Sequence, residues 1–337
     1  MIEKLEELSN SKILVTGGCG FLGRHIVTFL LDKGHQVTVL DDLSTGLLSN
    51  IPVDHPHLTF VQGSVLNREL VQKHSFEMNL IIHLASTVGM KLVYKKPDES
   101  YTISKNGTEN IFLTPAHIPV VLFSSSAVYG QTSFSKVAED QSVTLDDALS
   151  YDGGVYGYAV GKWEMELIGK REMKKGRKVM IIRPFNVVGS GQSSTYGMVV
   201  PNFIKKALSG SPITIFDDGV QSRSFTCANT FVYYLYKLMK NSKAWEYPNN
   251  IINLGANHST TINELARIII SETKSSSTVE YLDYDQVFPK KKDVRHRNPD
   301  LSLLNELVEE VVEWPSIQNI VTRMLALQAQ HQNMVLQ

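Results

Sequence analysis

Short continuous runs of apolar residues mark the first half of the chain, and they show little of the alternation expected of a half-exposed strand. Longer stretches with apolar residues at helical spacing separate these runs. The runs lie at residues 12–18, 35–42, 58–63, 79–86, 119–126 and 178–185. Parallel strands covered on both faces by helices lose the alternating pattern, so the runs predict an α/β fold with a doubly wound parallel sheet.

The second half of the chain is richer in loops and predicts a smaller α+β lobe. Across the chain, helices are expected at about 21–33, 97–115, 156–175, 201–210, 228–240 and 261–274. Further strands are expected at 213–219, 252–255 and 279–284, with a Gly/Ser-rich loop at 189–197 and a basic turn at 290–297. No linker separates the halves, so we expect them to interleave. The prediction assigns 1–185, completed by about 226–257, to the sheet domain, and 186–225 with 258–337 to the lobe.

Composition narrows the class of protein without identifying it. The 337 residues carry Lys+Arg 33 against Asp+Glu 34, a formal charge of -1, and contain no basic block, so no nucleic acid partner is expected. No apolar run approaches the ~20 residues that span a bilayer, and the first ten residues are acidic and amphipathic, so we expect a cytoplasmic protein without a membrane partner. Cys19 and Cys227 lack metal-ligand spacing, which predicts free thiols and no bound metal.

Three glycines in TGGCGFLG, Gly17, Gly20 and Gly23, follow the first predicted strand and open the first predicted helix. They allow a tight turn and let a pyrophosphate approach the N–H groups at the helix N-terminus. Asp41 ends the second strand, where a carboxylate can accept both hydroxyls of an adenosine ribose and repels a 2′-phosphate. The alternatives are a plain strand-to-helix turn and a solvated strand end. Together, the two features predict a Rossmann-type site that prefers NAD to NADP.

Tyr158 and Lys162 are four residues apart, so on a helix they share one face. A tyrosine is a poor base at neutral pH unless a nearby cation favours the phenolate, and Lys162 with a positively charged nicotinamide could supply that cation. The fifth predicted strand ends in three hydroxyl residues at 124–126, one of which could bind a substrate oxygen. Alone, this spacing occurs by chance on many helices.

In combination, these motifs resemble the extended short-chain dehydrogenases/reductases, specifically the NAD-dependent nucleotide-sugar epimerases, dehydratases and decarboxylases. The motifs that carry the resemblance are TGGCGFLG, Asp41, HLAS (83–86), SSSAVYG (124–130), Tyr158 with Lys162, RPFNVVG (183–189), YGMVVPNF (196–203), DDGVQSRSF (217–225) and RNPD (297–300). They occur in this order over nearly the whole chain. The resemblance implies an NAD-binding Rossmann domain and a lobe that binds a nucleotide sugar.

The resemblance also implies a role for individual residues. Tyr158 matches the catalytic base, Lys162 the lysine that lowers its pKa and holds the nicotinamide ribose, and Ser125 the catalytic Ser/Thr. The other implied cofactor contacts are Gly17, Gly20, Phe21, Leu22, Gly23, Asp41, Ser64, Val65, Leu84 and Ala85. The implied substrate contacts are Ser125, Ser126, Asn186, Val199, Arg223, Arg297 and Asp300. Arginines suit this task because their planar fork pairs with phosphate oxygens.

The positions after the catalytic serine distinguish the reactions of the family. Dehydratases resembling this chain carry an Asp-Glu pair there and decarboxylases keep the Glu, whereas this chain has Ser126 and Ala127. Neither is a general acid or base, so the sequence predicts a UDP-hexose 4-epimerase. The alternative is a UDP-sugar dehydratase or UDP-glucuronate decarboxylase whose acid comes from elsewhere, such as Glu139 or Asp140. An NAD-sensing protein without catalysis is a third class, which the intact Tyr158 and Lys162 argue against.

Three departures from the family pattern accompany this prediction. Ser64 replaces an Asp that often contacts adenine, Ser104 replaces an Asn near the nicotinamide, and Asn229 stands where an Asp is common. His83 ends a buried strand and is expected to be a core histidine instead of a catalyst. By resemblance, a homodimer is expected to form through the helices at 97–115 and 156–175.

Overall fold

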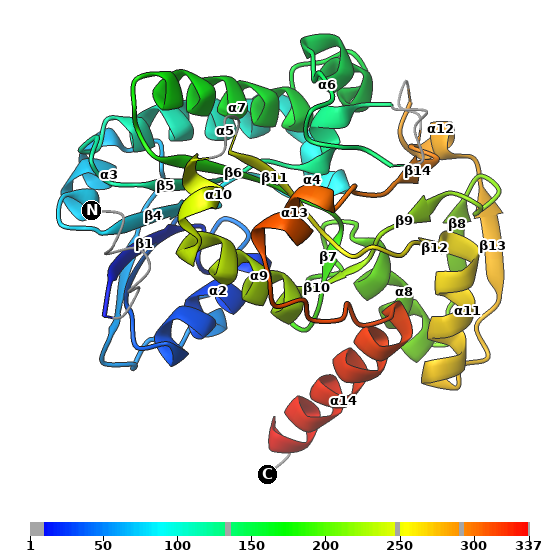
Figure 1. The fold of residues 1–337 in the computed structure, drawn as a ribbon. Coiled ribbons are helices and arrows are strands. Elements are labelled where there is room, and N and C mark those ends of the chain that lie inside the picture. Colours follow the sequence, from blue (N-terminus) through cyan, green and yellow to red (C-terminus); the bar gives the residue numbers. More distant parts are fainter. Residues whose placement is uncertain (1–9, 132–135, 247–249, 290–292, 336–337) are drawn as a thin grey trace.

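The fold is built around a parallel sheet of seven strands in the order β11-β6-β5-β4-β1-β2-β3 (Figure 1). The computed structural model describes residues 10–131, 136–246, 250–289 and 293–335. The strands are β1 (Lys12–Thr16), β2 (Gln36–Asp41), β3 (Leu58–Gln62), β4 (Leu80–His83), β5 (Val120–Phe123), β6 (Val179–Pro184) and β11 (Ile251–Leu254). All neighbouring pairs are parallel, which confirms the predicted Rossmann-type fold class.

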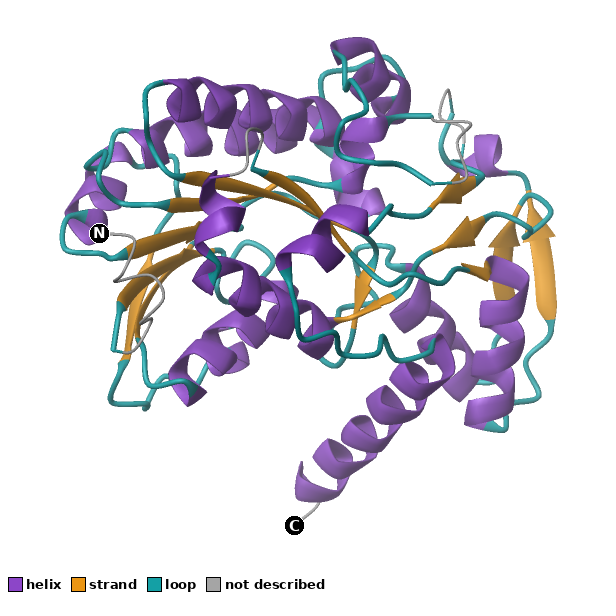
Figure 2. Ribbon diagram, in the orientation of Figure 1, coloured by secondary structure: helices purple, strands orange, loops and turns teal. Residues whose placement is uncertain are grey.

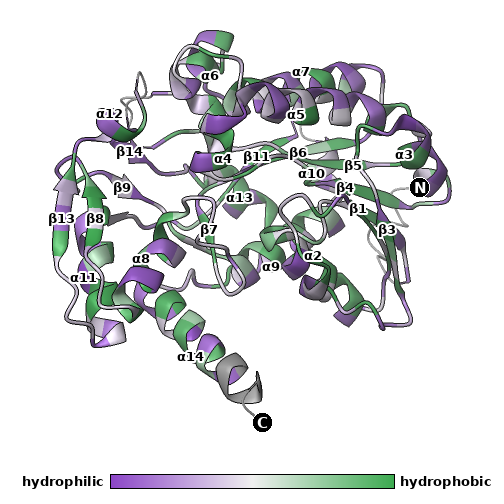
Figure 3. Ribbon diagram, turned by 180° about the vertical axis from the view of Figure 1, so that it is seen from behind, coloured by the Kyte–Doolittle hydropathy of each residue, from purple (hydrophilic) through white to green (hydrophobic). Residues whose placement is uncertain are grey.

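Helices cover both faces of this sheet, which explains the continuous apolar runs (Figure 2). Along β1, Ile13 and Val15 belong to a hydrophobic cluster with α2 and α9, whereas Leu14 between them belongs to a cluster with α5 and α7. One face carries α2 (Phe21–Asp32), α9 (Ala228–Lys240), α10 (Ser242–Glu246) and α13 (Ser302–Leu307). The other carries α3 (Arg68–Ser75), α5 (Pro97–Phe112) and α7 (Tyr158–Lys174). Hydrophobic residues gather on the strands and on the helix surfaces that face them (Figure 3).

The second lobe has its own hydrophobic cluster and its own small sheets. The cluster lies among α8 (Val199–Leu208), α11 (Ile262–Thr273), α14 (Ile317–Val335), β8 (Ile213–Phe216) and β13 (Val279–Leu282). A three-stranded sheet orders β12 (Thr260–Thr261), β9 (Ser222–Arg223) and β14 (His296–Arg297). The smaller elements are η1 (Leu48–Asn50), α4 (Met90–Lys95), η2 (Ser126–Tyr129), α6 (Leu145–Asp152), β7 (Val187–Val188), β10 (Thr226–Cys227) and α12 (Tyr284–Val287).

The predicted turn at 290–297 is wrong at its end, because His296 and Arg297 form β14 and pair with β9. Residues 290–292 lie outside the described residues, as does 1–9, on which part of the cytoplasmic prediction was based. Several helices, including α3, α6 and α14, were not expected from the sequence. In the parts of the chain that the structure describes, no helix is long and apolar enough to cross a membrane.

The two halves interleave along the chain. β11 returns to the edge of the main sheet beside β6, after the chain has built part of the lobe. Leu301, Leu304 and Trp314 then pack in the same hydrophobic cluster as β1, although the sequence assigned 258–337 to the lobe. The chain therefore crosses between the halves several times.

A buried ion pair fastens α7 to the sheet. Arg183 of β6 donates from Nε and Nη2 to the two carboxylate oxygens of Glu166 on α7, at 2.8 and 2.7 Å, and each side chain is 1% exposed. Ser124, directly after β5, donates to Glu166 Oε1 at 2.6 Å. Burial alone raises the pKa of Glu166, but the charge and hydrogen bonds of Arg183 bring it below its usual value. The Glu166 carboxylate is therefore charged, and it has hydrogen-bond partners on β6 and directly after β5.

We expect Glu166→Ala to lower the free energy of unfolding by about 3–5 kcal/mol, because it leaves the Arg183 guanidinium buried without its counter-charge. The measurement is urea denaturation followed by circular dichroism. Glu99→Ala is the control: Glu99 lies on the neighbouring helix α5 and pairs with Lys96, and the two side chains are 49% and 56% exposed, so its loss should cost only about 0–1 kcal/mol. Equal losses for the two variants would contradict the structural role of the buried pair.

Candidate functional site

The candidate site begins where the strand order reverses, between β1 and β4. Loops at the carboxyl ends of neighbouring strands diverge at such a point and leave a crevice for a ligand. The glycine-rich turn follows β1 there and leads into α2. Gly20 caps α2 without a side-chain hydrogen bond, and the first turn has no acidic residue. The amide groups at this helix end are therefore available to an anion.

Two glycines of the turn are required by close backbone contacts. A Cβ on Gly23 would overlap the carbonyl oxygen of Gly17. Gly17 itself has φ +72°, and a Cβ there would lie 2.8 Å from the amide nitrogen of Ala85. The turn therefore packs directly on the backbone that follows β4. This arrangement leaves its outer side as the cradle for a pyrophosphate.

Asp41 joins the glycine-rich turn to the end of β2. Its Oδ2 accepts a hydrogen bond from the amide of Cys19 at 2.9 Å, and its Oδ1 accepts one from the amide of Leu43 at 2.8 Å. Burial raises the pKa of Asp41, and these two hydrogen bonds oppose the shift. Each oxygen retains a further lone pair. The carboxylate can therefore still accept a pair of ribose hydroxyls.

The remaining residues predicted to contact the cofactor lie on the same edge of the sheet. Leu84 and Ala85 follow β4, and their amides bond to the backbone and hydroxyl oxygens of Thr16. Ser64 and Val65 follow β3, where the Ser64 hydroxyl accepts from the amide of Leu66. The carboxyl ends of β1, β2, β3 and β4 thus bring together segments that are distant in sequence.

Tyr158, Ser125 and Lys162 lie together beside β5. Tyr158 opens α7, and its phenol is hydrogen-bonded to Ser125, which precedes η2. Lys162 is 2% exposed, and its Nζ donates to the carbonyl oxygen of Phe123 at 2.7 Å. The Nζ atom lies 5.9 Å from the centre of the Tyr158 ring. The half-buried tyrosine and serine and the buried lysine therefore share one corner of the site.

Burial disfavours the charged forms of both titrating groups of this corner. It raises the pKa of Tyr158 to about 12, while the Ser125 hydrogen bond opposes that rise. It lowers the pKa of Lys162 to about 7. A tyrosine with this pKa is not a base near neutral pH, so an added positive charge is needed to make it one.

Tyr151 and Asp152, at the end of α6, complete this corner, and the sequence did not indicate either of them. Asp152 is 1% exposed, and its Oδ2 accepts from the amide of Val160 in the first turn of α7. Its charge raises the pKa of both Tyr151 and Tyr158. An acid at the end of a helix carries no signal of its own in the sequence, so only the three-dimensional position of Asp152 beside Tyr158 distinguishes it.

Two arginines from the lobe lie side by side opposite Tyr151. In the register of β9 and β14, Arg223 is the direct partner of Arg297. Arg223 forms an ion pair with Asp293 at 2.5 Å and donates to the carbonyl oxygen of Val294. The Arg297 guanidinium lies 5.0 Å from the centre of the Tyr151 ring. Asp293, which sequence reasoning did not single out, therefore partly neutralises this pair.

Arg297 is almost completely buried, yet one of its N–H donors has no partner among the described residues. It is 5% exposed, and its Nη2 donates to the carbonyl oxygen of Gly130 at 2.6 Å. Its Nε has no hydrogen-bond partner among the described residues. Burial lowers the pKa of Arg297 to about 10, which leaves it charged at neutral pH. The group is thus a buried cation with an open donor, which suits a phosphate oxygen.

The other predicted substrate residues occupy three separate loops. Asn186 follows β6 with a φ of 33°, and its side-chain amide donates to the carbonyl oxygen of Ser224. Val199 begins α8, and Ser126 is buried in η2. The Asp300 carboxylate accepts from the amide of Ser302, at the start of α13. Asp300 therefore contacts the start of α13 in this structure.

Glu139, one of the acids considered as a replacement for the missing carboxylate, belongs to another group of residues. Its Oε1 accepts from the backbone amide of Asn253 at 2.7 Å, and its electrostatic neighbours are Arg183 and Asp300. Asp140, the other acid considered, is exposed. His83 is fully buried with its Nδ1 2.7 Å from the Thr16 hydroxyl, as expected of a core histidine, whereas its Nε2 has no hydrogen-bond partner among the described residues. Ser104, at the usual Asn position, contacts the hydroxyl of Ser86 at 2.9 Å.

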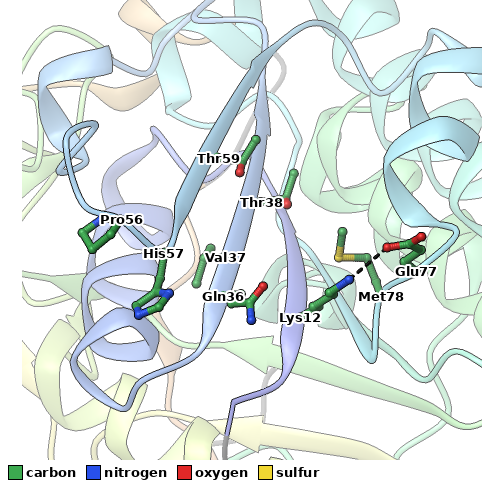
Figure 4. Close-up of a pocket in the computed structure, with 9 residues that line it drawn as sticks. All are labelled: Lys12, Gln36, Val37, Thr38, Pro56, His57, Thr59, Glu77 and Met78. Carbon is green, nitrogen blue, oxygen red and sulfur yellow. Dashed lines mark hydrogen bonds and ion pairs between the residues drawn. The ribbon is translucent and has the colours of Figure 1, made fainter.

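A small cavity of about 210 Å³ lies at the opposite, amino-terminal ends of β1, β2 and β3 (Figure 4). Lys12 and Glu77 form an ion pair at its wall, and the other lining residues include polar His57 and Thr59 and apolar Val37 and Met78. None of the residues predicted to act on a cofactor or substrate lines it. The cavity is therefore separate from the candidate site.

Comparison with known proteins agrees with this geometry. The model of the NAD dependent epimerase/dehydratase family matches residues 13–255. The chain belongs to this family. It is accordingly an NAD-dependent enzyme of the nucleotide-sugar epimerases, dehydratases and decarboxylases. The predicted resemblance is confirmed at this level, whereas the reaction and the sugar are not resolved by it.

Individual relatives carry out different reactions. The UDP-N-acetyl-alpha-D-glucosaminuronate decarboxylase of Bacillus cytotoxicus is 30% identical over 88% of this chain and 92% of its own length. A putative UDP-glucose 4-epimerase of Methanocaldococcus jannaschii is 32% identical over 77% of this chain and 82% of its length. The solved UDP-N-acetylglucosamine 4-epimerase of Methanobrevibacter ruminantium superimposes with a TM-score of 0.82 at 26% identity, covering 96% of this chain and all of that one.

NAD fits the residues described above. The uncapped amino end of α2 and the glycine cradle suit its pyrophosphate, and the Asp41 carboxylate suits the adenosine ribose. When bound, NAD supplies the acceptor and donor of hydride. Its positively charged nicotinamide would also favour the phenolate form of Tyr158, which burial alone opposes.

Asp152→Asn is expected to shift the acidic limb of the pH–turnover profile to lower pH. Burial is the larger cause of the raised pKa of Tyr158, but the Asp152 charge adds to it, so removing that charge lowers the pKa and makes the phenolate available at lower pH. The asparagine oxygen can still accept from Val160. Asp146→Asn, an exposed change on the same helix, is the control and should leave the profile in place. An unchanged or upward-shifted limb in Asp152→Asn would count against this electrostatic role.

Proposed function

We propose that the protein is a UDP-hexose 4-epimerase. The observation that carries the proposal is that Tyr158, Ser125 and Lys162 share one corner of the site, while Ser126 and Ala127 stand at the positions where related lyases carry acids. Inverting a hydroxyl-bearing carbon requires a base, a hydroxyl-binding group and hydride exchange. It does not require a further acid to expel water or to protonate a carbon.

The chain's own residues would divide this work as follows. Ser125 holds the C4 hydroxyl of the sugar, and Tyr158 removes its proton as the hydrogen on C4 leaves as hydride. Lys162, protonated and close to the phenol, keeps the proton affinity of Tyr158 low enough for this step. That hydride would pass to bound NAD and return to the opposite face of the 4-keto carbon, and Tyr158 returns the proton to the new hydroxyl. Arg223 and Arg297 would hold the UDP diphosphate while the sugar turns.

The second candidate function is a UDP-glucuronate decarboxylase or a dehydratase of the same family. The decarboxylase from Bacillus cytotoxicus and several UDP-glucuronic acid decarboxylases match the chain over most of its length, which supports this alternative. Asp152 is the carboxylate that acts electrostatically on Tyr158, and in this alternative it would stand in for the acid missing at Ala127. Both functions share the initial oxidation at C4.

Product analysis distinguishes these functions. The protein, with NAD, is incubated separately with UDP-glucose, UDP-N-acetylglucosamine and UDP-glucuronate, and the products are identified by NMR. We expect a C4 epimer of one of these sugars with its carbon count unchanged. Release of carbon dioxide or formation of a deoxy sugar, without an epimer, would refute the epimerase and support the alternative.

Tyr158→Phe is expected to lower kcat by about 10²–10⁴-fold, because the phenyl ring cannot accept the hydroxyl proton. The affinity for UDP should stay within about twofold, since the diphosphate is held elsewhere. Tyr156→Phe is the matched control, because Tyr156 lies two residues away with its side chain 47% exposed. If both variants turned over at the unmodified rate, Tyr158 would not be the base.

We further propose a cytoplasmic homodimer formed through α5 and α7, as the resemblance implies. Apolar side chains that remain exposed on or beside α7, including Leu167 at 41% and Val155 at 47%, support this surface. Light scattering after size exclusion should give twice the 37.7 kDa of one chain. Leu167→Glu should shift the mass toward the monomer, and Leu208→Glu, at an exposed position of α8, should not. A monomeric unmodified protein would contradict the proposal.

A further inference from the structure

Tyr129 lies between the two halves of the site and touches neither the predicted cofactor residues nor the predicted substrate residues through its hydroxyl. It ends η2 and is 5% exposed. Arg183 Nη1 donates to its hydroxyl oxygen at 2.8 Å, and that hydroxyl donates to Asn253 Oδ1 at 2.8 Å. The carbonyl oxygen of Ala138 lies 3.2 Å away. A hydroxyl has a single proton, so Asn253 is the better-placed acceptor.

The hydroxyl is firmly held on the side of the sheet. The Arg183 guanidinium lies 4.6 Å from the centre of the Tyr129 ring and is committed through its other nitrogens to Glu166. Burial raises the pKa of Tyr129 to about 12, so it stays protonated and remains a donor. Tyr129 therefore donates one hydrogen bond, to Asn253, and its contacts with Arg183 fix the direction of that bond.

From Asn253 the hydrogen bonds continue to the segment that carries Arg297. Asn253 Nδ2 donates to the carbonyl oxygen of Val137 at 2.9 Å, and that same oxygen accepts from the amide of Asp300 at 2.8 Å. The amide of Val137 donates in turn to the carbonyl oxygen of Asn298 at 2.9 Å. Val137 thus forms a bridge with the residues that immediately follow Arg297.

A second, shorter route leads to the guanidinium itself. Gly130 follows Tyr129 in the chain, and its carbonyl oxygen accepts from Arg297 Nη2 at 2.6 Å. Gly130 has φ +65°, and a Cβ there would overlap the carbonyl oxygen of Asp147, so its backbone has little freedom to adjust. Moving the Tyr129 ring would therefore move the acceptor of Arg297 as well.

We propose that Tyr129 is a positioning residue for Arg297, joining the buried Arg183–Glu166 pair to residues 297–300 so that the guanidinium is held where a nucleoside diphosphate binds. The inference rests on the proposed function, because it takes a diphosphate as the ligand of Arg297. It adds a cause for the placement of that cation: Glu166 on α7 and the segment that carries Arg297 in the lobe are joined through Arg183, Tyr129 and Asn253 by one chain of hydrogen bonds.

Tyr129→Phe removes the hydroxyl and keeps the ring. We expect it to raise the Kd for UDP, measured by calorimetry on the NAD-loaded protein, by roughly tenfold, since Arg183 and Asn253 lose a buried partner and Arg297 loses its fixed position. The Kd for NAD should change by less than about twofold. Tyr234→Phe is the matched control: its buried hydroxyl bonds to the backbone of Val312, away from the site, so its loss should cost stability without changing the UDP affinity.

A double-variant comparison tests whether Tyr129 acts through Arg297. Arg297→Ala should weaken UDP binding, and adding Tyr129→Phe should weaken it little further, because the group being positioned is already gone. Asn253→Ala interrupts the same chain one step later and should reproduce the affinity loss, which covers the case of an unstable Tyr129→Phe. An unchanged UDP affinity in a folded Tyr129→Phe, or effects that multiply in the double variant, would overturn the proposal. If the unmodified protein bound no UDP, the proposed substrate class itself would fail, and this role with it.

Discussion

The buried ion pair between Glu166 and Arg183 is the interaction on which the site depends. Removing two charges from water is costly, so such a pair is stable only when the geometry is bidentate and other donors and acceptors are satisfied. Here the carboxylate also accepts from Ser124, and the guanidinium also donates to Tyr129. These contacts fix α7, β6, the end of β5 and the end of η2 relative to one another.

That constraint positions the groups that would do the chemistry. Lys162 lies one helical turn before Glu166 on α7, and Ser125 directly follows Ser124. Tyr158 opens the same helix, whose first turn is held by Asp152. Each functional side chain is therefore one turn or one residue from a buried polar contact, which is the kind of rigid support that a proton-transfer site requires.

The electrostatics of the site suit a charged ligand. In the protein alone, burial favours neutral Tyr158 and weakens the charge of Lys162, while Arg297 remains a buried cation. A positively charged nicotinamide would favour the phenolate of Tyr158, and a dianionic diphosphate would stabilise the Arg297 cation. The near-zero net charge of the chain is compatible with this, because two placed arginines serve a diphosphate better than general basicity does.

The sequence by itself determined the class of fold, the glycine cradle with Asp41, and the helix that carries Tyr158 and Lys162. These features are local: strand burial, helical spacing and the need for glycine in a tight turn are all expressed within a few residues. The continuous runs of β1 and β6 were visible for the same reason, because helices cover them on both sides.

Only the tertiary structure decided which distant residues meet around those motifs. Asp152 beside Tyr158, Asp293 on Arg223 and the link from Tyr129 to Asn253 join positions that carry no mutual signal in the sequence. The sequence pattern predicts a turn at the position of the short strand β14, because its two residues form a strand only through pairing with β9. Hydrogen bonds and charges act through space, so their partners are fixed by the packing of the two halves and not by their order along the chain.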